Sequence, residues 1–190
     1  MKNKLIIFAG PSGSGKTTLV HHLLKKLPEL SFSVSATTRQ QRANEKNGID
    51  YHFISEEAFK EKIAQDAFVE WEQVYVGGYY GTLRSEIERV WSLNKSVVFD
   101  VDVEGALRIK KIYEKEALAV MVMPPSIEKL KERLHARATE TPESLQKRID
   151  KAEHELSYAF LFDKVIVNDK VETALLEALT ISKDFLKESY

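Results

Sequence analysis

The stretch Gly10–Pro11–Ser12–Gly13–Ser14–Gly15–Lys16–Thr17 has the form G-x-x-x-x-G-K-[ST], a motif whose glycine loop binds phosphate groups. Before it, the apolar run Leu5–Ala9 predicts a buried strand. After it, apolar residues recur at helical spacing over residues 18–27, and Pro28 ends the pattern. The sequence therefore predicts a strand, a glycine loop and a helix, in the order that this motif requires.

The residue types of this loop match the chemistry of phosphate binding. Glycines allow positive φ angles and bring backbone N–H groups close to an anion, and the start of a helix adds further N–H groups. We expect all eight residues to bind ATP, with Lys16 reaching the β- and γ-phosphates and Thr17 ligating Mg²⁺. A glycine turn that only packs a helix on a strand is the alternative, and it leaves Lys16 and Thr17 unexplained.

Length and composition narrow the class of protein. The 190 residues are 43% hydrophobic, which suits one globular domain with room for an inserted subdomain. The net charge of −1 gives no global basic field, so we expect no nucleic-acid partner. The chain has no Cys, which excludes disulfides and cysteine nucleophiles. No signal-type segment or membrane-length apolar run is present, so we expect a cytoplasmic protein.

The rest of the chain predicts an α/β fold with a central parallel sheet. Apolar strand patterns at residues 5–9, 96–101, 117–123 and 165–167 alternate with helical patterns, which favours helices on both faces of the sheet. Residues 32–81 differ, because short half-polar strands there, at 32–35, 51–54 and 68–76, are separated by a polar loop at 36–50 and a glycine turn at 76–81. We interpret this part as a small β-rich subdomain over the carboxyl edge of the sheet.

Several strings together resemble the guanylate kinase family, in order and over almost the whole chain. They are GPSGSGKTTL, FSVSATTRQQR, NGIDYHFIS, FVEWEQV, YYGT, VVFDVDVEGA, MPPSIEKLKERLHARATET and DKVIVND. The resemblance implies a P-loop three-layer α/β sandwich that transfers the γ-phosphoryl group of ATP to GMP with Mg²⁺. It also implies a core (about 1–31, 82–124 and 162–190), a GMP-binding subdomain (about 32–81) and a helical lid (about 125–161).

The phosphate of GMP requires cations in a fixed arrangement, and arginine is well suited to bind it through two hydrogen bonds. Arg39 and Arg42 lie three residues apart in the polar loop, and Tyr51 and Tyr80 add hydroxyl donors. The family uses the matching positions in this way. The alternative is that both arginines are solvated loop charges, which is the default for a lone arginine.

Guanine presents N1–H and a 2-amino group, and one carboxylate can accept from both. By the resemblance, Glu70 is this carboxylate, Asp102 is a second acid beside the base, and Ser35 and Thr82 are hydroxyls that meet the base oxygen. If Glu70 stood alone, an exposed position on an alternating strand would be the default interpretation. Glu72 lies on the same face without an assigned role and serves as a comparison.

The remaining expected site residues belong to the phosphoryl-transfer chemistry. Asp100 ends the central strand and is expected to hold Mg²⁺ together with Thr17; a strand-end acid that caps the next helix is the alternative. The catalytic set is Lys16 with three arginines of the lid, Arg133, Arg137 and Arg148, and Arg133 is also explained as a helix surface charge.

Three positions depart from the family pattern. Ala136 and Ala138 flank Arg137 where the family commonly has glycine, which restricts the lid. The loop at residues 76–79 is one residue longer and lacks its usual Asn. Gln41 replaces a common Pro between the two phosphate arginines, which predicts a looser loop.

Two other functions remain open from the sequence. One is a non-catalytic interaction module, since domains of this kind also serve as scaffolds, and the other is a related small-molecule kinase with a different acceptor. Intact phosphate-loop and lid residues weigh against the first, and Glu70 is the residue that decides the second. Whether the chain acts as a monomer or a homo-oligomer is also open.

Overall fold

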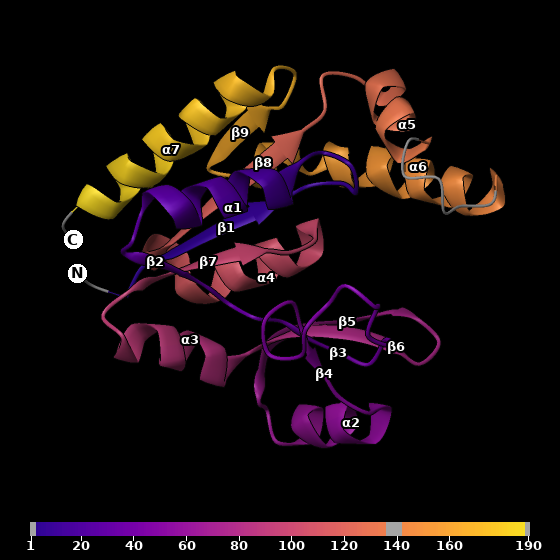
Figure 1. The fold of residues 1–190 in the computed structure, drawn as a ribbon, viewed down its shortest axis with the longest axis vertical. Helices are drawn as coiled ribbons and strands as arrows, with labels where there is room; N and C mark the ends of the chain where they lie inside the picture. The colour runs from indigo at the N-terminus through magenta and orange to yellow at the C-terminus, as the bar shows by residue number, and fades with distance from the viewer. Residues whose placement is uncertain (1–2, 136–141, 189–190) are drawn as a thin grey trace.

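A five-stranded parallel sheet forms the centre of the molecule (Figure 1). The structure is a computed structural model that describes residues 3–135 and 142–188. The strand order is β2-β7-β1-β8-β9, and the bounds are β1 (Leu5–Ala9), β2 (Leu30–Phe32), β7 (Ser96–Asp100), β8 (Ala117–Met123) and β9 (Lys164–Val167). Each neighbouring pair is parallel, as the alternation of strands and helices predicts.

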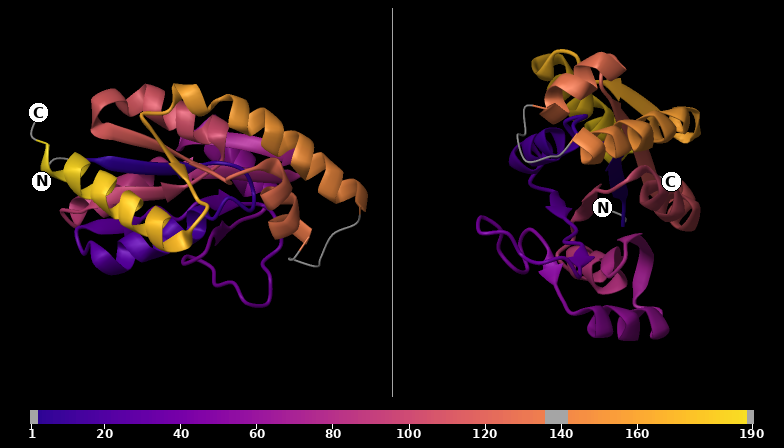
Figure 2. Two further views of the ribbon diagram at one scale, coloured as in Figure 1. Left: turned by 90° about the horizontal axis from the view of Figure 1, so that it is seen from above. Right: turned by 90° about the vertical axis from the view of Figure 1, so that its right-hand side faces the viewer.

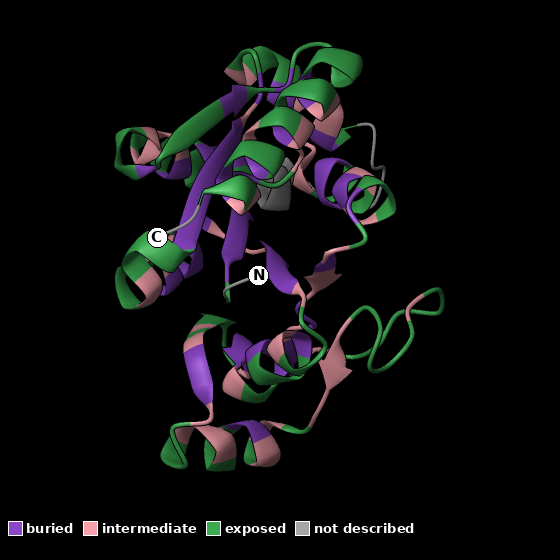
Figure 3. Cartoon of the chain, turned by 90° about the vertical axis from the view of Figure 1, so that its left-hand side faces the viewer, coloured by how far each residue is buried: buried purple, intermediate pink, exposed green. Residues whose placement is uncertain are grey.

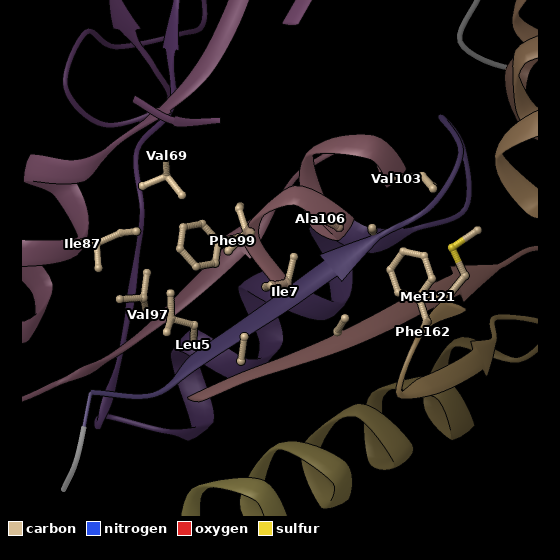
Figure 4. Packing of buried hydrophobic residues seen from close by; sticks show 14 of the residues in the cluster. Leu5, Ile7, Val69, Ile87, Val97, Phe99, Val103, Ala106, Met121 and Phe162 are labelled. Carbon is tan, nitrogen blue, oxygen red and sulfur yellow. The ribbon is translucent and has the colours of Figure 1, made fainter. Parts of the chain in front are cut away.

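Helices cover both faces of this sheet, which confirms the expected three-layer arrangement. One face packs on α1 (Lys16–Lys26) and α7 (Val171–Lys187), and the other on α3 (Arg84–Ser92) and α4 (Val103–Tyr113). Figure 4 shows the second face, where Ile7, Phe99 and Met121 of three different strands are buried together with Ala106 of α4. Figure 3 shows that burial concentrates along these central strands.

Two further helices lie at one end of the molecule. They are α5 (Ile127–His135) and α6 (Pro142–Ser157), and two short 3-10 helices, η1 (Glu114–Glu116) and η2 (Ala159–Leu161), lead into β8 and β9. The Ser126 hydroxyl accepts a hydrogen bond from Lys129 N at the start of α5, and α6 begins with proline. Figure 1 places α5 and α6 at the end of the sheet opposite the two chain termini.

A second, four-stranded sheet is formed by the middle of the sequence. Its order is β4-β3-β6-β5, with β3 (Ala36–Thr37), β4 (His52–Phe53), β5 (Phe68–Tyr75) and β6 (Gly78–Leu83). The helix α2 (Glu56–Ala64) follows Ser55, whose hydroxyl caps it by accepting from Ala58 N. This sheet and α2 lie below the large sheet in Figure 1 and in the right-hand view of Figure 2, and Val69 of β5 joins the buried cluster of the large sheet.

Two sequence-based assignments of strands are wrong. The strand expected at residues 32–35 is β2, which ends at Phe32 and pairs with β7 in the large sheet, because Leu30 is buried in that core. The turn expected at residues 76–81 contains the strand β6. Its glycines are required by contacts, since a Cβ on Gly78 would lie 2.3 Å from the Tyr75 ring and one on Gly81 would lie 2.8 Å from the Phe68 ring.

Within residues 3–135 and 142–188, no helix combines the length and the apolar character that crossing a membrane requires.

Candidate functional site

The glycine loop connects β1 to α1 and has the backbone conformation that its sequence predicts. Gly10, Gly13 and Gly15 have positive φ angles of 143°, 88° and 98°. Side chains are excluded for a second reason, because a Cβ on Gly10 would lie 2.2 Å from the carbonyl oxygen of Val122. The loop therefore brings backbone N–H groups to the start of α1, where the helix dipole also favours an anion.

Lys16 lies against this loop. Its ammonium group donates hydrogen bonds to the carbonyl oxygens of Gly10 at 2.5 Å and Pro11 at 3.2 Å. The cation therefore lies beside the backbone groups that suit a phosphate, as expected for a residue that neutralises transferred charge.

Thr17 of α1 and Asp100 at the end of β7 are in contact. The Thr17 hydroxyl donates to an Asp100 carboxylate oxygen at 2.5 Å. Mg²⁺ is usually bound by one or two protein oxygens together with waters and phosphate oxygens, so this hydroxyl–carboxylate pair fits that ion. Over residues 3–135 and 142–188, no group of three or more His, Cys, Asp or Glu side chains is placed to hold a metal ion.

Asn168, which follows β9, has a role that the sequence analysis did not assign. Its buried side chain donates to the backbone carbonyl oxygen of Ser14 in the glycine loop at 2.7 Å. The backbone carbonyl oxygen of Asn168 accepts from the Arg133 side chain at 2.8 Å. Asn168 therefore connects the glycine loop to a predicted catalytic arginine. The string DKVIVND contained it, but local sequence gives no sign of a partner 154 residues away.

The predicted phosphate arginine Arg39 is held in a two-point ion pair. Its Nη1 and Nη2 atoms donate to the two carboxylate oxygens of Glu45 at 2.7 and 2.6 Å. The same carboxylate accepts from Arg42 N at 2.9 Å, and the Gln41 side chain donates to the carbonyl oxygen of Glu45. These hydrogen bonds join residues 39–45 where proline is replaced by Gln41, and the looser loop expected from Gln41 stays a prediction.

Tyr51 and Tyr80 lie beside Arg39. The Arg39 guanidinium lies 5.1 Å from the centroid of the Tyr51 ring, and the Tyr80 hydroxyl is within hydrogen-bonding contact of it. Burial raises the pKa of the Tyr51 hydroxyl, and the charge of Asp100 also raises it. Arg42 is exposed in the same loop.

The predicted guanine acceptors meet at the start of α4. Glu70 of β5 accepts from the Thr82 hydroxyl at 2.7 Å, and Asp102 caps α4 by accepting from Gly105 N at 2.7 Å. A Cβ on Gly105 would lie 3.0 Å from an oxygen of each carboxylate, so both side chains flank this glycine. Burial raises the pKa of Glu70, and the charge of Asp102 raises it further. The two acids therefore form one acceptor site although 32 residues separate them in sequence.

Glu72 is not the isolated comparison residue that the sequence suggests. Its carboxyl group makes a hydrogen bond with Asp102, which, together with burial, raises the pKa of Glu72 to about 7. The same hydrogen bond helps to lower the pKa of Asp102 despite its burial. Two carboxyl groups this close share a proton more readily than both ionise, so Glu72 supports the acid beside it.

The other predicted residues are placed less closely. Ser35 is half-buried in the crossing from β2 to β3, where its carbonyl oxygen accepts from His52 N at 2.9 Å. Arg148 lies on α6 with an exposed side chain. Arg137 and its flanking alanines lie outside the described residues. The Thr82 hydroxyl donates its hydrogen bond to Glu70. In this structure it therefore orients that carboxylate.

The geometry brings together two groups suited to anions and one group of acceptors. The glycine loop and Lys16 form the first, and the Arg39 loop forms the second. The acceptor group at Gly105 includes Glu70, which lies on β5 of the small sheet. Such a site can hold a phosphate donor and a phosphorylated acceptor at once, which is the requirement for direct transfer.

The chain is similar to known proteins in sequence and in fold. A sequence profile of the family described as guanylate kinase matches residues 2–185. A guanylate kinase of Bacteroides fragilis is 49% identical over 183 residues, which cover 96% of this chain and 90% of the relative, and one of Bacteroides thetaiotaomicron is 47% identical over 99% and 92%. The crystal structure of guanylate kinase from Anaplasma phagocytophilum superposes with a TM-score of 0.78 at 26% identity, over 98% of this chain and 88% of that one.

Proposed function

The chain belongs to the guanylate kinase family, and we propose that it transfers the γ-phosphoryl group of ATP to GMP, giving ADP and GDP. The observation that carries this proposal is the placement of Glu70 of β5 and Asp102 at the start of α4 around Gly105, while Arg39 follows β3 of the same small sheet as β5. Two carboxylates suit the N–H groups on the guanine edge, and the arginine suits a phosphate on the same nucleotide.

ATP binds at residues 10–17 in this proposal, with its phosphates on the backbone N–H groups and on Lys16. Thr17 and Asp100 would hold Mg²⁺, which when bound would supply positive charge against the phosphates. Arg133, Arg137 and Arg148 belong to the proposed lid at residues 125–161 and meet the charge that develops on the transferred group. The hydrogen bond from Arg133 to the backbone of Asn168 supports the role of Arg133, because the Asn168 side chain also contacts the glycine loop.

GMP binds across the small sheet, in the proposed subdomain at residues 32–81. Arg39, Arg42, Tyr51 and Tyr80 take its phosphate, and Glu70 and Asp102 take the guanine edge, with hydroxyls supplied by Ser35 and Thr82. Because the acceptors at Gly105 are buried, a base without matching donors leaves them unpaired, which lowers its binding. We also propose a cytoplasmic location, where both nucleotides occur.

The direct test measures ADP formation by the purified chain with Mg-ATP and one of four conditions: GMP, AMP, UMP or no acceptor. The proposal predicts rapid ADP formation with GMP and only background rates in the other three. Equal rates with AMP or UMP would leave the donor site in place but contradict the assignment of Glu70 and Asp102. ADP formation that needs no acceptor would identify a nucleotide hydrolase instead.

A further inference from the structure

The loop at residues 40–50 is exposed at every position except Glu45. The side chain of Glu45 is only 16% exposed, and that of its partner Arg39 is 12% exposed. An acidic side chain turned inward from an exposed loop is unusual, since an isolated carboxylate is normally left in water. Glu45 has a partner that explains its position, and the geometry of that pairing has a consequence for phosphate binding.

The Glu45 carboxylate uses one edge of the Arg39 guanidinium and leaves the next edge available. Arginine has five N–H donors. The two on Nη1 go to the carbonyl oxygen of Gln40 at 2.9 Å and to Glu45, and one on Nη2 goes to Glu45. The Nε–H group and the second N–H of Nη2 are not used by these two residues, and the Tyr80 hydroxyl, a second proposed phosphate ligand, is within hydrogen-bonding contact of the same guanidinium. These two N–H groups lie parallel on an adjacent edge, which matches two oxygens of a phosphate.

Other contacts keep this guanidinium in one orientation. Its Cζ atom lies 5.1 Å from the centroid of the Tyr51 ring and 5.4 Å from that of Phe53, so two aromatic faces restrain its plane. The hydrogen bond from Arg39, followed by that from the backbone of Arg42, lowers the pKa of Glu45 to about 2. The carboxylate is therefore charged at neutral pH, and the ion pair persists there.

We propose that Glu45 is a positioning residue for the phosphate of GMP, because it holds the Nη1/Nη2 edge of Arg39 and the backbone of Arg42 while the Nε/Nη2 edge remains for phosphate. This inference rests on the proposed function. The opposite effect is also physically reasonable, since a carboxylate on an arginine can compete with a phosphate for the same cation. The two cases predict changes of opposite sign when Glu45 is removed.

The experiment uses the full chain with Glu45→Ala, Glu45→Gln and Glu45→Asp, and Asp66→Asn as a matched control. Asp66 also pairs with an arginine, Arg84 at 3.2 Å, but it lies outside the proposed site. For each variant, KM is measured for GMP and for ATP, and Ki is measured for guanosine as an inhibitor of GMP phosphorylation. Guanosine has the same base but no phosphate, so it reports on the pocket without the group that Arg39 is proposed to bind.

We expect Glu45→Ala to raise the KM for GMP about tenfold, the scale of one charge-assisted hydrogen bond. The guanosine Ki and the ATP KM stay unchanged, Glu45→Gln behaves like Glu45→Ala, Glu45→Asp recovers part of the loss, and Asp66→Asn resembles the wild type. An unchanged or lower KM for GMP in Glu45→Ala would overturn the inference, and so would equal losses for GMP and guanosine. If the wild-type chain does not phosphorylate GMP, the proposed function itself is wrong.

Discussion

The glycine loop and the arginine loop are two phosphate sites built by different means within one chain. The glycine loop uses backbone N–H groups, three glycines with positive φ and one lysine that folds over the loop. The arginine loop uses side chains on an exposed segment, and its order comes from Glu45 and two aromatic rings. The first site is encoded almost entirely by consecutive residues, whereas the second depends on partners from β4 and β6.

This difference matches what each site is proposed to do. Backbone N–H groups of a loop that is held between a buried strand and a helix bind phosphates rigidly, which suits the phosphoryl group that is transferred. Side chains on a loop can adjust around a small acceptor and can be tuned by their neighbours. The two sites should therefore respond differently to substitution, and four experiments test that expectation.

The largest effect is expected from removing the cation of the glycine loop. Lys16→Met should lower kcat by about 10³-fold, near the upper end of the loss seen when one preorganised donor to a developing charge is removed. The KM for GMP should change little, because Lys16 lies against the glycine loop, where its ammonium group donates to the carbonyl oxygens of Gly10 and Pro11. Steady-state rates measure both quantities. Lys25→Met, an exposed position on the same helix, is the control, and equal losses in both variants would contradict the role of Lys16.

The next effect concerns the acceptors of the small sheet. Glu70→Ala should reduce the preference for GMP over AMP by at least about 10²-fold, since discrimination of this kind arises when buried polar groups lose their partners. Competition between GMP and AMP for phosphorylation measures the preference. Glu61→Ala on α2 serves as the exposed control. If Glu70→Ala retained the preference, the guanine assignment would be lost while the donor site remained.

Glycines in the two loops should differ in their effect on stability. Gly15 and Gly48 both have positive φ, but a Cβ on Gly15 would lie 2.1 Å from the Asn168 side chain, whereas one on Gly48 meets nothing within 4 Å. Gly48→Ala should lower the free energy of unfolding by about 1 kcal/mol through backbone strain alone. Gly15→Ala should lower it further, and denaturant unfolding measures both. Equal losses would show that the contact with Asn168 does not restrict the loop.

The smallest effect concerns pH and the pair Glu72–Asp102. The pKa of Glu72 in the folded protein, about 7, lies above its ordinary value of 4.5. Between these values the folded state binds more protons than the unfolded state, so this group's contribution to stability falls as pH rises through about 7. Glu72→Gln, which cannot lose a proton, should therefore show a smaller loss of unfolding free energy between pH 6 and pH 8 than the wild type. Glu104→Gln is the exposed control, and a wild-type slope in Glu72→Gln would refute the shared proton.

Most of the fold follows from local sequence patterns. Continuous apolar runs predicted β1, β7 and β8, the three central strands of the large sheet. The strand β6 was missed because its glycines resemble a turn, although they are needed where the Tyr75 and Phe68 rings cross the neighbouring strand. Such a requirement comes from packing between strands and is invisible in the local pattern.

Some residues of the functional site could likewise be predicted from local sequence, and others could not. The glycine loop was predictable because its residues are consecutive and each has a physical reason. The positions of Asn168 and Glu72 were not, since their partners Ser14 and Asp102 are distant in sequence. Glu45 lies only six residues from Arg39, and an acid within a loop that carries two arginines is a signal that the sequence did contain.

The central claim is that both phosphate sites are occupied together and that the phosphoryl group passes directly between them. Initial rates of ADP formation, with ATP and GMP varied in a full grid, test this most directly. The account predicts double-reciprocal lines that intersect, because both substrates must be bound before either product leaves. Parallel lines, the pattern of a covalent phosphoenzyme that forms before GMP binds, would contradict it.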